Sequence, residues 1–208
     1  MVRLLALRHG ETDWNRTGRL QGWAPIGLND SGRAQARALA EDLEDLEGIA
    51  SVGHVDRLVT SDLRRTRETA SVLREALDLP TPQAERAFRE RHLGVYQGLP
   101  VDAVRERHPE LDDIGAVTGL QVTPESGESL ADVADRVRQG VTMLRTEAEP
   151  DETVVLVTHG GPIRILVAEA TGRDLLATIR DIHPRNCEAF AFDIGGDITF
   201  EGKSRARR

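Results

Sequence analysis

The chain has 208 residues, of which 39% are hydrophobic and 30% charged, so it can fold around a core of its own. The net charge of −8 argues against a general nucleic-acid binder. The apolar runs are far too short to span a bilayer, and the first is too short for the apolar part of a signal peptide. We therefore expect a soluble, cytoplasmic protein without nucleic-acid or membrane partners.

Arginine supplies nearly all of the positive charge. The single lysine, Lys203, begins a basic C-terminal run over 203–208 that we expect to be frayed. Schiff-base chemistry and a Walker-type phosphate loop need a placed lysine, so we expect neither. Any bound anion is then held by arginine, histidine or backbone N–H groups. The single cysteine, Cys187, is expected to be a core thiol, and no Cys/His cluster has zinc-site spacing.

Short apolar runs alternate with helical patterns along the first half of the chain. Capping side chains predict where each helix begins, and glycine or proline predicts where it ends. The predicted elements are a strand over 2–7, a helix from Asn29 or Asp30 to about Leu46, a strand over 57–60 and a helix from Ser61 or Asp62 to Leu77. A loop with strand character follows over 88–98.

The second half continues the alternation after a short helix over 100–108 that has Pro100 in its first turn. Residues 111–127 have no clear period, and residues 99–126 are expected to form a small cap. The remaining predicted elements are a helix over 129–148, a strand over 153–157, a further helix, and strands over 188–194 and 198–200. This order predicts one α/β domain over 1–202, in three layers, with a mostly parallel central sheet and helices on both faces.

Two of the predicted strands end in the same pair of residues. His9-Gly10 follows the first strand, and His159-Gly160 follows the strand over 153–157. Ligands of open α/β sheets bind beyond the carboxyl ends of the strands, so histidines on neighbouring strands would converge on one ligand. The glycines let the backbone turn and approach that ligand. One such histidine alone would favour a structural role, whereas two in matching contexts favour a shared site.

The neighbouring charges predict that this ligand is an anion. Arg8 precedes the first histidine, and Arg65 lies in the first turn of a predicted helix, where the helix dipole also attracts anions. Arginine binds phosphate through paired N–H donors. A histidine beside fixed guanidinium groups should have a lowered pKa and keep a nucleophilic nitrogen at pH 7. Those are the conditions for attack on phosphorus, with the oxygen charges neutralised by cationic side chains.

Five blocks in this order resemble the histidine phosphatase superfamily, the phosphoglycerate mutase-like family. The first block contains Arg8-His9-Gly10-Glu11-Thr12, and the resemblance covers most of the chain. The matching segments are residues 7–15 with 18–23 and 28–36, then 61–70, 88–98, 127–129 and 158–161. Each block alone is a weak signal, but five in the right order make chance implausible. The resemblance implies a metal-free phosphoryl-transfer enzyme without a cofactor.

The resemblance also implies a role for each matched residue. His9 would be the nucleophile that becomes phosphohistidine, and Glu90 would protonate the leaving oxygen and then activate water. The catalytic set is completed by the groups that would hold the phosphoryl oxygens, Arg8, Arg65 and His159. Substrate contacts are expected from Asn15, Gln21, Gly22 and Gly160.

Three residues keep more than one interpretation at this point. Glu90 could instead form a surface salt bridge with Arg89 or Arg91. Arg164, one helical turn after the second His-Gly pair, could support the site from behind. His183 could line the pocket or lie on the surface.

The family contains both phosphatases and mutases, which differ in the acceptor of the phosphoryl group. Mutases carry a longer insertion with a paired arginine and a lysine, whereas residues 99–126 hold only the separated Arg105 and Arg107. Gly161 stands where mutases typically carry asparagine. In contrast, the amino-acid sequence of residues 90–98 is more similar to that of the mutases. We therefore expect a metal-independent phosphatase acting on small phosphomonoesters. A cofactor-dependent phosphoglycerate mutase and a non-catalytic binding protein are the alternatives, and a homodimer is left open.

Overall fold

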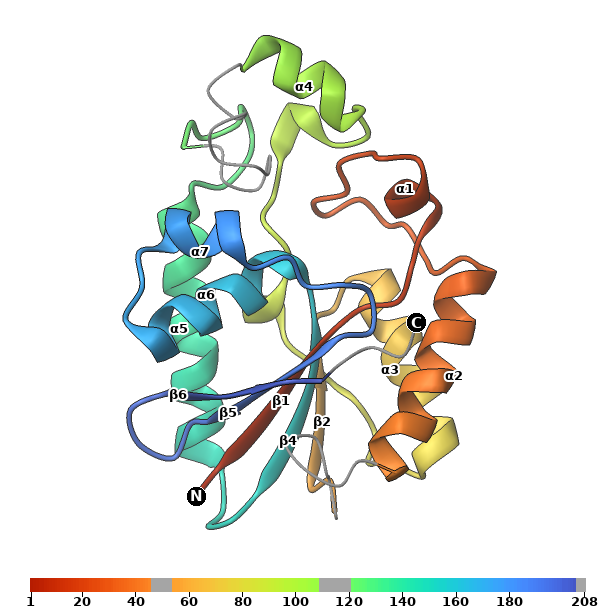
Figure 1. The fold of residues 1–208 in the computed structure, drawn as a ribbon, viewed down its shortest axis with the longest axis vertical. Helices are drawn as coiled ribbons and strands as arrows, with labels where there is room; N and C mark the ends of the chain where they lie inside the picture. Colours follow the sequence, from red (N-terminus) through yellow and green to blue (C-terminus); the bar gives the residue numbers. More distant parts are fainter. Residues whose placement is uncertain (46–53, 109–120, 205–208) are drawn as a thin grey trace.

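The computed structural model describes residues 1–45, 54–108 and 121–204, and a six-stranded sheet runs through its centre (Figure 1). The strands are β1 (Arg3–Arg8), β2 (Arg57–Thr60), β3 (Gln83–Ala84), β4 (Thr153–Thr158), β5 (Ala189–Asp193) and β6 (Thr199–Lys203). Their order across the sheet is β3-β2-β4-β1-β5-β6, with β3, β2, β4 and β1 mutually parallel and β5 antiparallel to both neighbours. The predicted mostly parallel sheet is confirmed.

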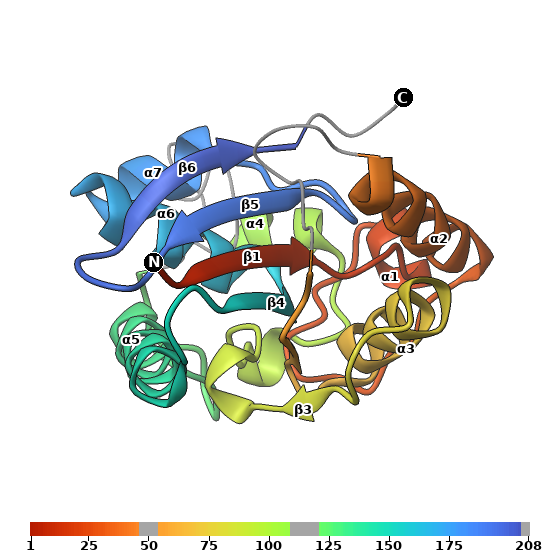
Figure 2. The ribbon, with the colours of Figure 1, turned by 90° about the horizontal axis from the view of Figure 1, so that it is seen from below.

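Helices cover both faces of this sheet, as predicted. The helices of the described residues are α1 (Asp13–Arg16), α2 (Asp30–Asp45), α3 (Arg64–Leu77), α4 (Val101–Arg107), α5 (Leu130–Glu147), α6 (Gly160–Thr171) and α7 (Leu175–Asp181). Of these, α1 and α4 lie above the upper end of the sheet in Figure 1 and do not cover a face. Figure 2 shows α2 and α3 on one side of the sheet and α5 and α6 on the other. Within the described ranges, no helix is both long enough and apolar enough to cross a membrane.

The strand residues alternate between two hydrophobic cores, because successive side chains of a strand point to opposite faces. Leu4 and Ala6 of β1 pack in the core beneath α5 and α6, whereas Leu5 and Leu7 pack in the core beneath α2 and α3. Both faces of β1 and β4 are therefore buried, which is why these strands read as continuous apolar runs rather than alternating ones.

Most predicted elements are confirmed, and the differences have local causes. The helix predicted to begin at Ser61 or Asp62 begins at Arg64, after the N-cap residue Leu63, which has no capping side chain. The side chains of Ser61 and Asp62 are engaged elsewhere, with His159 and Arg89. The segment 88–98 contains no strand; two single 3₁₀ turns, Arg86–Phe88 and Gly94–Tyr96, flank its extended part.

Other differences concern short or terminal segments. The short elements α1, β3 and α7 were not expected, because two to seven residues are too few to show a period. The predicted helix end at Leu46 and residues 109–120 of the expected cap lie outside the described residues. The cap residues that are described include α4, whose Val104 packs against Leu20 and Leu93.

The frayed tail was predicted to begin at Lys203, but the structure shows Lys203 and Ser204 hydrogen-bonded or paired at the end of the sheet. Lys203 closes β6, and its Nζ lies 3.0 Å from the buried carboxylate of Glu188. The next residue, Ser204, still donates from its backbone N–H to the carbonyl of Ala189. The single lysine of the chain therefore neutralises a buried acid, and of the predicted tail residues 205–208 lie outside the described part.

Two glycines allow the loop after β1 to lie directly against the start of α2. A Cβ on Gly32 would lie 2.1 Å from the carbonyl oxygen of Glu11, and one on Gly10 would lie 2.5 Å from the carbonyl oxygen of Gly32. Gly10 does not have a positive φ. The glycine after His9 is thus explained by a close approach between two backbone segments, and not by a left-handed turn.

We expect Gly32→Ala to lower the free energy of unfolding by about 2 kcal/mol, because the new methyl group must push the loop after β1 away from α2. Urea unfolding followed by circular dichroism measures this change. The matched control is Gly196→Ala, where an added Cβ meets no atom within 4 Å. Equal stability of the two variants would contradict this account of the glycine pair.

Candidate active site

The two strand-ending histidines meet at the carboxyl edge of the sheet. β1 and β4 pair in parallel with Arg8 opposite Thr158, so His9 and His159 leave the sheet at the same level. Their ring centroids lie 5.2 Å apart, and both side chains are buried. The backbone N–H of His9 also donates to the carbonyl of Thr158. The predicted convergence of the two histidines is confirmed.

Hydrogen bonds fix the orientation and the proton position of the His9 ring. Nδ1 lies 2.7 Å from the carbonyl oxygen of Gly10. A carbonyl oxygen can only accept, so Nδ1 carries the proton and Nε2 carries the lone pair. The Arg65 Nε–H donates to this Nε2 over 3.2 Å. The nitrogen with nucleophilic capacity therefore faces the guanidinium that was predicted to bind the anion.

The surroundings of both histidines favour the neutral ring. Burial, and then the charges of Arg65 and Arg8, hold the pKa of His9 well below its usual value. Burial and the charge of Arg65 likewise lower the pKa of His159. A neutral His9 keeps its lone pair at pH 7, as the sequence predicted.

Arg65 is a fully buried cation that links the site to a distant loop. Its side chain is 1% exposed, and it donates to the carbonyl oxygens of Gly22 at 2.8 Å and Ala24 at 3.4 Å. Gly22 has φ of +49°, and a Cβ there would lie 2.3 Å from the amide oxygen of Gln97. Burial lowers the pKa of Arg65 to about 10, so the guanidinium remains charged at pH 7.

The C-terminal segment that follows His183 holds Arg8 and His9 from the other side. Arg8 Nη1 donates to the carbonyl of Pro184 over 2.6 Å, and Asn186 Nδ2 donates to the carbonyl of His9 over 2.8 Å. Cys187 is buried as predicted, and burial raises the pKa of its thiol to about 12. No local pattern could reveal these contacts, because they join residues about 176 positions apart.

His159 is anchored by a second residue that sequence reasoning did not select for the site. Its Nε2 lies 3.0 Å from the hydroxyl oxygen of the buried Ser61. Its Nδ1 is buried and has no hydrogen-bond partner among the described residues, and the same is true of Arg8 Nε. Buried polar atoms without partners are costly, so these two atoms suit a polar ligand.

Backbone N–H groups, rather than arginine side chains, hold the Glu90 carboxylate. Oε1 accepts from the N–H of Arg91 at 2.9 Å, and Oε2 accepts from the N–H of Gly161 at 3.2 Å. The alternative salt bridge with Arg89 is wrong, because Arg89 pairs with Asp62. The Arg91 guanidinium donates to backbone carbonyls instead.

Glu90 nevertheless belongs to the same electrostatic site as the buried arginines. Its negative charge opposes the fall in the pKa of both Arg8 and Arg65. A Cβ on Gly161 would lie 2.2 Å from Glu90 Oε1, so the glycine leaves room for the carboxylate. The site therefore combines a neutral imidazole, buried cations and one carboxylate, which suits transfer of a phosphoryl group.

The residues that were predicted to contact substrate differ in their surroundings. Asn15 lies in α1 and completes its capping box, in which Asn15 Oδ1 accepts from the N–H of the N-cap residue Thr12. Gln21 is buried, and its Oε1 has no partner among the described residues. Gly160 opens α6, and Arg164 Nη1 would lie 3.3 Å from a Cβ added there. His183 is exposed, which favours the surface interpretation.

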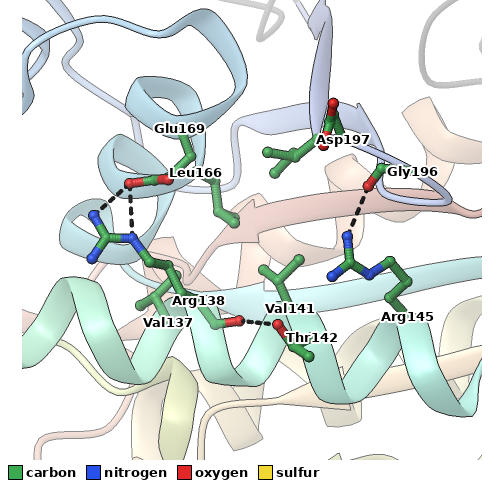
Figure 3. Close-up of a pocket in the computed structure, with 10 residues that line it drawn as sticks. Val137, Arg138, Val141, Thr142, Arg145, Leu166, Glu169, Gly196 and Asp197 are labelled. Carbon is green, nitrogen blue, oxygen red and sulfur yellow. Dashed lines mark hydrogen bonds and ion pairs between the residues drawn. The ribbon is translucent and has the colours of Figure 1, made fainter.

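A separate hollow lies between α5, α6 and the turn from β5 to β6, with a volume of about 210 Å³ (Figure 3). It is lined by Val137, Val141 and Leu166 together with the Arg138–Glu169 ion pair. It contains no histidine or cysteine. Within the described ranges, no group of three or more acidic, His or Cys side chains could hold a metal ion. The cluster around His9 is therefore the candidate active site.

Comparison with known proteins shows the family of the chain. The profile of the Histidine phosphatase superfamily (branch 1) matches residues 4–199. The chain belongs to this superfamily. Like the resemblance seen in the sequence blocks, the match spans both His-Gly strands and the segment that carries Glu90.

Individual members of the superfamily are similar over most of their length. The chain is 33% identical over 174 residues to the uncharacterized phosphatase PhoE of Bacillus subtilis, covering 84% of this chain and 80% of that protein. It is 34% identical over 175 residues to phosphoserine phosphatase 1 of Hydrogenobacter thermophilus, covering 84% and 79%. The structure of mycobacterial glucosyl-3-phosphoglycerate phosphatase complexed with VO3 superposes with a TM-score of 0.81 at 33% identity, covering 99% of each chain.

The lowered pKa values of His9 and His159 predict that stability falls on acidification. Below the unfolded pKa of about 6.5, the unfolded chain binds protons that the folded histidines do not. Each buried histidine should therefore cost about 1.4 kcal/mol of unfolding free energy per pH unit below that point. Urea melts between about pH 5.5 and 7.5 measure this slope.

The variant His159→Asn removes one of the two histidines, so the slope of unfolding free energy against pH should fall by the contribution of one proton, about 1.4 kcal/mol per pH unit. His54→Asn is the matched control, because the His54 side chain is 81% exposed. A wild-type stability that does not change across this range would contradict the neutral, buried state of both rings.

Proposed function

We propose that this protein is a metal-independent phosphatase that hydrolyses small phosphomonoesters through a phosphohistidine on His9. The observation that carries the proposal is the arrangement of the His9 ring. Its Nδ1–H is held by the carbonyl of Gly10, and its Nε2 lies 3.2 Å from the buried guanidinium of Arg65. An anionic phosphoryl group drawn to the guanidinium would thus meet the lone pair of Nε2.

In the first step, His9 Nε2 attacks phosphorus, and the bond from phosphorus to the ester oxygen breaks. Arg8, Arg65 and His159 bind the non-bridging oxygens and stabilise the charge that these atoms carry. The Glu90 carboxyl donates its proton to the departing alkoxide.

In the second step, water attacks phosphorus, and the nitrogen–phosphorus bond breaks. The Glu90 carboxylate accepts a proton from the water, which restores the carboxyl group for the next cycle. Inorganic phosphate leaves, and His9 returns with its lone pair on Nε2. The two guanidinium groups supply the charge neutralisation, so the proposed reaction needs no metal ion.

The substrate class is supported by the names of the relatives and by the charge of the site. Relatives include phosphatases named for phosphoserine and for glucosyl-3-phosphoglycerate, which are small phosphomonoesters.

Hydrolysis is favoured over mutase chemistry by Gly161. This glycine leaves room for Glu90, and the mutases of the family typically carry asparagine at its position. Arg105 and Arg107 lie in α4 and are not adjacent, so they do not form the paired arginine of the mutases.

Hydrolysis of p-nitrophenyl phosphate in EDTA, across roughly pH 5 to 8, tests this proposal. We expect turnover by the wild type that resists chelation and is lost on His9→Ala, because no other group takes the place of Nε2. Glu90→Gln should slow turnover of this ester by about 10²–10⁴-fold, since it removes the base that activates water in the second step. His54→Ala is the control for a general effect of losing an imidazole.

Two outcomes would contradict the proposal. Turnover retained by His9→Ala would exclude the phosphohistidine route. An inert wild type that interconverts phosphoglycerates after priming with bisphosphoglycerate would favour the mutase alternative. Phosphate retained on His9 from a labelled ester would contradict the non-catalytic alternative.

A further inference from the structure

We propose that Arg136 is a positioning residue that fixes Glu90 for proton transfer, with Glu128 as its anchor. This inference rests on the proposed role of Glu90. Arg136 lies on α5, 46 positions further along the chain, and it matches none of the sequence blocks that suggested the site. Its guanidinium nevertheless makes more contacts with the backbone around Glu90 than any other described side chain.

Arg136 binds three carbonyl oxygens of one short segment. Nη1 donates to the carbonyls of Ala87 at 2.9 Å and Arg89 at 2.6 Å, and Nη2 donates to the carbonyl of Glu90 at 2.9 Å. These residues lie at and just after the 3₁₀ turn Arg86–Phe88, outside any sheet ladder. Carbonyls in such a segment have no regular backbone partners, so the guanidinium supplies them.

Glu128 completes the arrangement on the other side of Glu90. Its carboxylate accepts from Arg136 Nε at 2.9 Å and Nη2 at 3.0 Å, and also from the backbone N–H of His92 at 2.8 Å. The ion pair thus holds the chain both before and after Glu90. Both side chains are less than 20% exposed, so water competes weakly for these bonds.

The helix that carries Arg136 is itself rigidly placed. Val133 and Val137, on either side of it, are each 1% exposed and belong to the core beneath the sheet. Trp23 adds one further bond, from its indole N–H to the Glu90 carbonyl over 2.6 Å. The Glu90 backbone is thereby fixed to the core, and its carboxylate is left to the two N–H groups described above.

Arginine is required here by geometry as well as by charge. A lysine has one nitrogen, which cannot reach three carbonyls and both oxygens of a carboxylate at once. Loss of the hydrogen bonds from Arg136 should let Glu90 shift, while His9, Arg8 and Arg65 keep their own contacts. A displacement of about 1 Å in a catalytic group can cost about 10²-fold in rate.

The choice of leaving group separates a positioning role from a general structural one. p-Nitrophenolate is a weak base that departs without a proton, whereas the alkoxide of glycerol 2-phosphate needs one from Glu90. The ratio of kcat/KM for these two esters therefore reports the proton transfer. Loss of folded protein, or of phosphate binding, would lower both values and leave the ratio unchanged.

We expect Arg136→Lys and Arg136→Met to lower kcat/KM for glycerol 2-phosphate by about 10²-fold and for p-nitrophenyl phosphate by less than about 5-fold. Glu90→Gln should move the ratio in the same direction and gives the scale of the effect. Glu128→Gln, which weakens the anchor but keeps Arg136, should give a smaller shift. Arg138→Met is the matched control, because Arg138 lies on the same helix and pairs with Glu169.

The outcomes distinguish this inference from the function on which it rests. A wild type that is inert toward both esters would overturn the proposed function and the inference with it. An active wild type whose ratio is unchanged by Arg136→Lys and Glu128→Gln would overturn the inference alone. A ratio shifted equally by Arg138→Met would also overturn it.

Discussion

The site depends on one constraint: the buried His9 ring must stay neutral, with its lone pair on Nε2. The carbonyl of Gly10 fixes the proton on Nδ1, and the charges of Arg65 and Arg8 disfavour a second proton on the ring. The same two guanidinium groups would attract a phosphate. In the proposed mechanism, a single arrangement of charge therefore keeps His9 reactive and favours the binding of the phosphoryl group that it attacks.

The rest of the fold can be understood as support for that arrangement. The parallel pairing of β1 with β4 brings His159 to the level of His9, and the glycine pair at Gly10 and Gly32 lets α2 pack close behind. Asn186 holds the His9 carbonyl from the opposite end of the chain. Arg136 and Glu128 hold the loop of Glu90 in a comparable way, so the proposed nucleophile and the proposed proton donor are each held by a polar side chain from a distant part of the sequence.

The sequence predicted those features of the site that depend on neighbouring residues in the chain. Continuous apolar runs gave β1 and β4, and the repeated His-Gly ending placed His9 and His159 at one edge of the sheet. Asn186, Ser61 and Arg136 could not be found in this way, because they act through hydrogen bonds to residues far away in sequence. The order of Lys203 could not be predicted for the same reason: the pairing of β5 with β6 is what brings it to its partner, Glu188.

The identity of the phosphorylated nitrogen tests the account most directly. The enzyme would be quenched in alkali during turnover of a labelled ester, and the two phosphohistidine isomers would be separated after digestion. The hydrogen bond from Nδ1 to Gly10 predicts that label is found on Nε2 of His9 alone. Label on Nδ1 of His9, or on His159, would contradict the proposed orientation of the ring and the mechanism built on it.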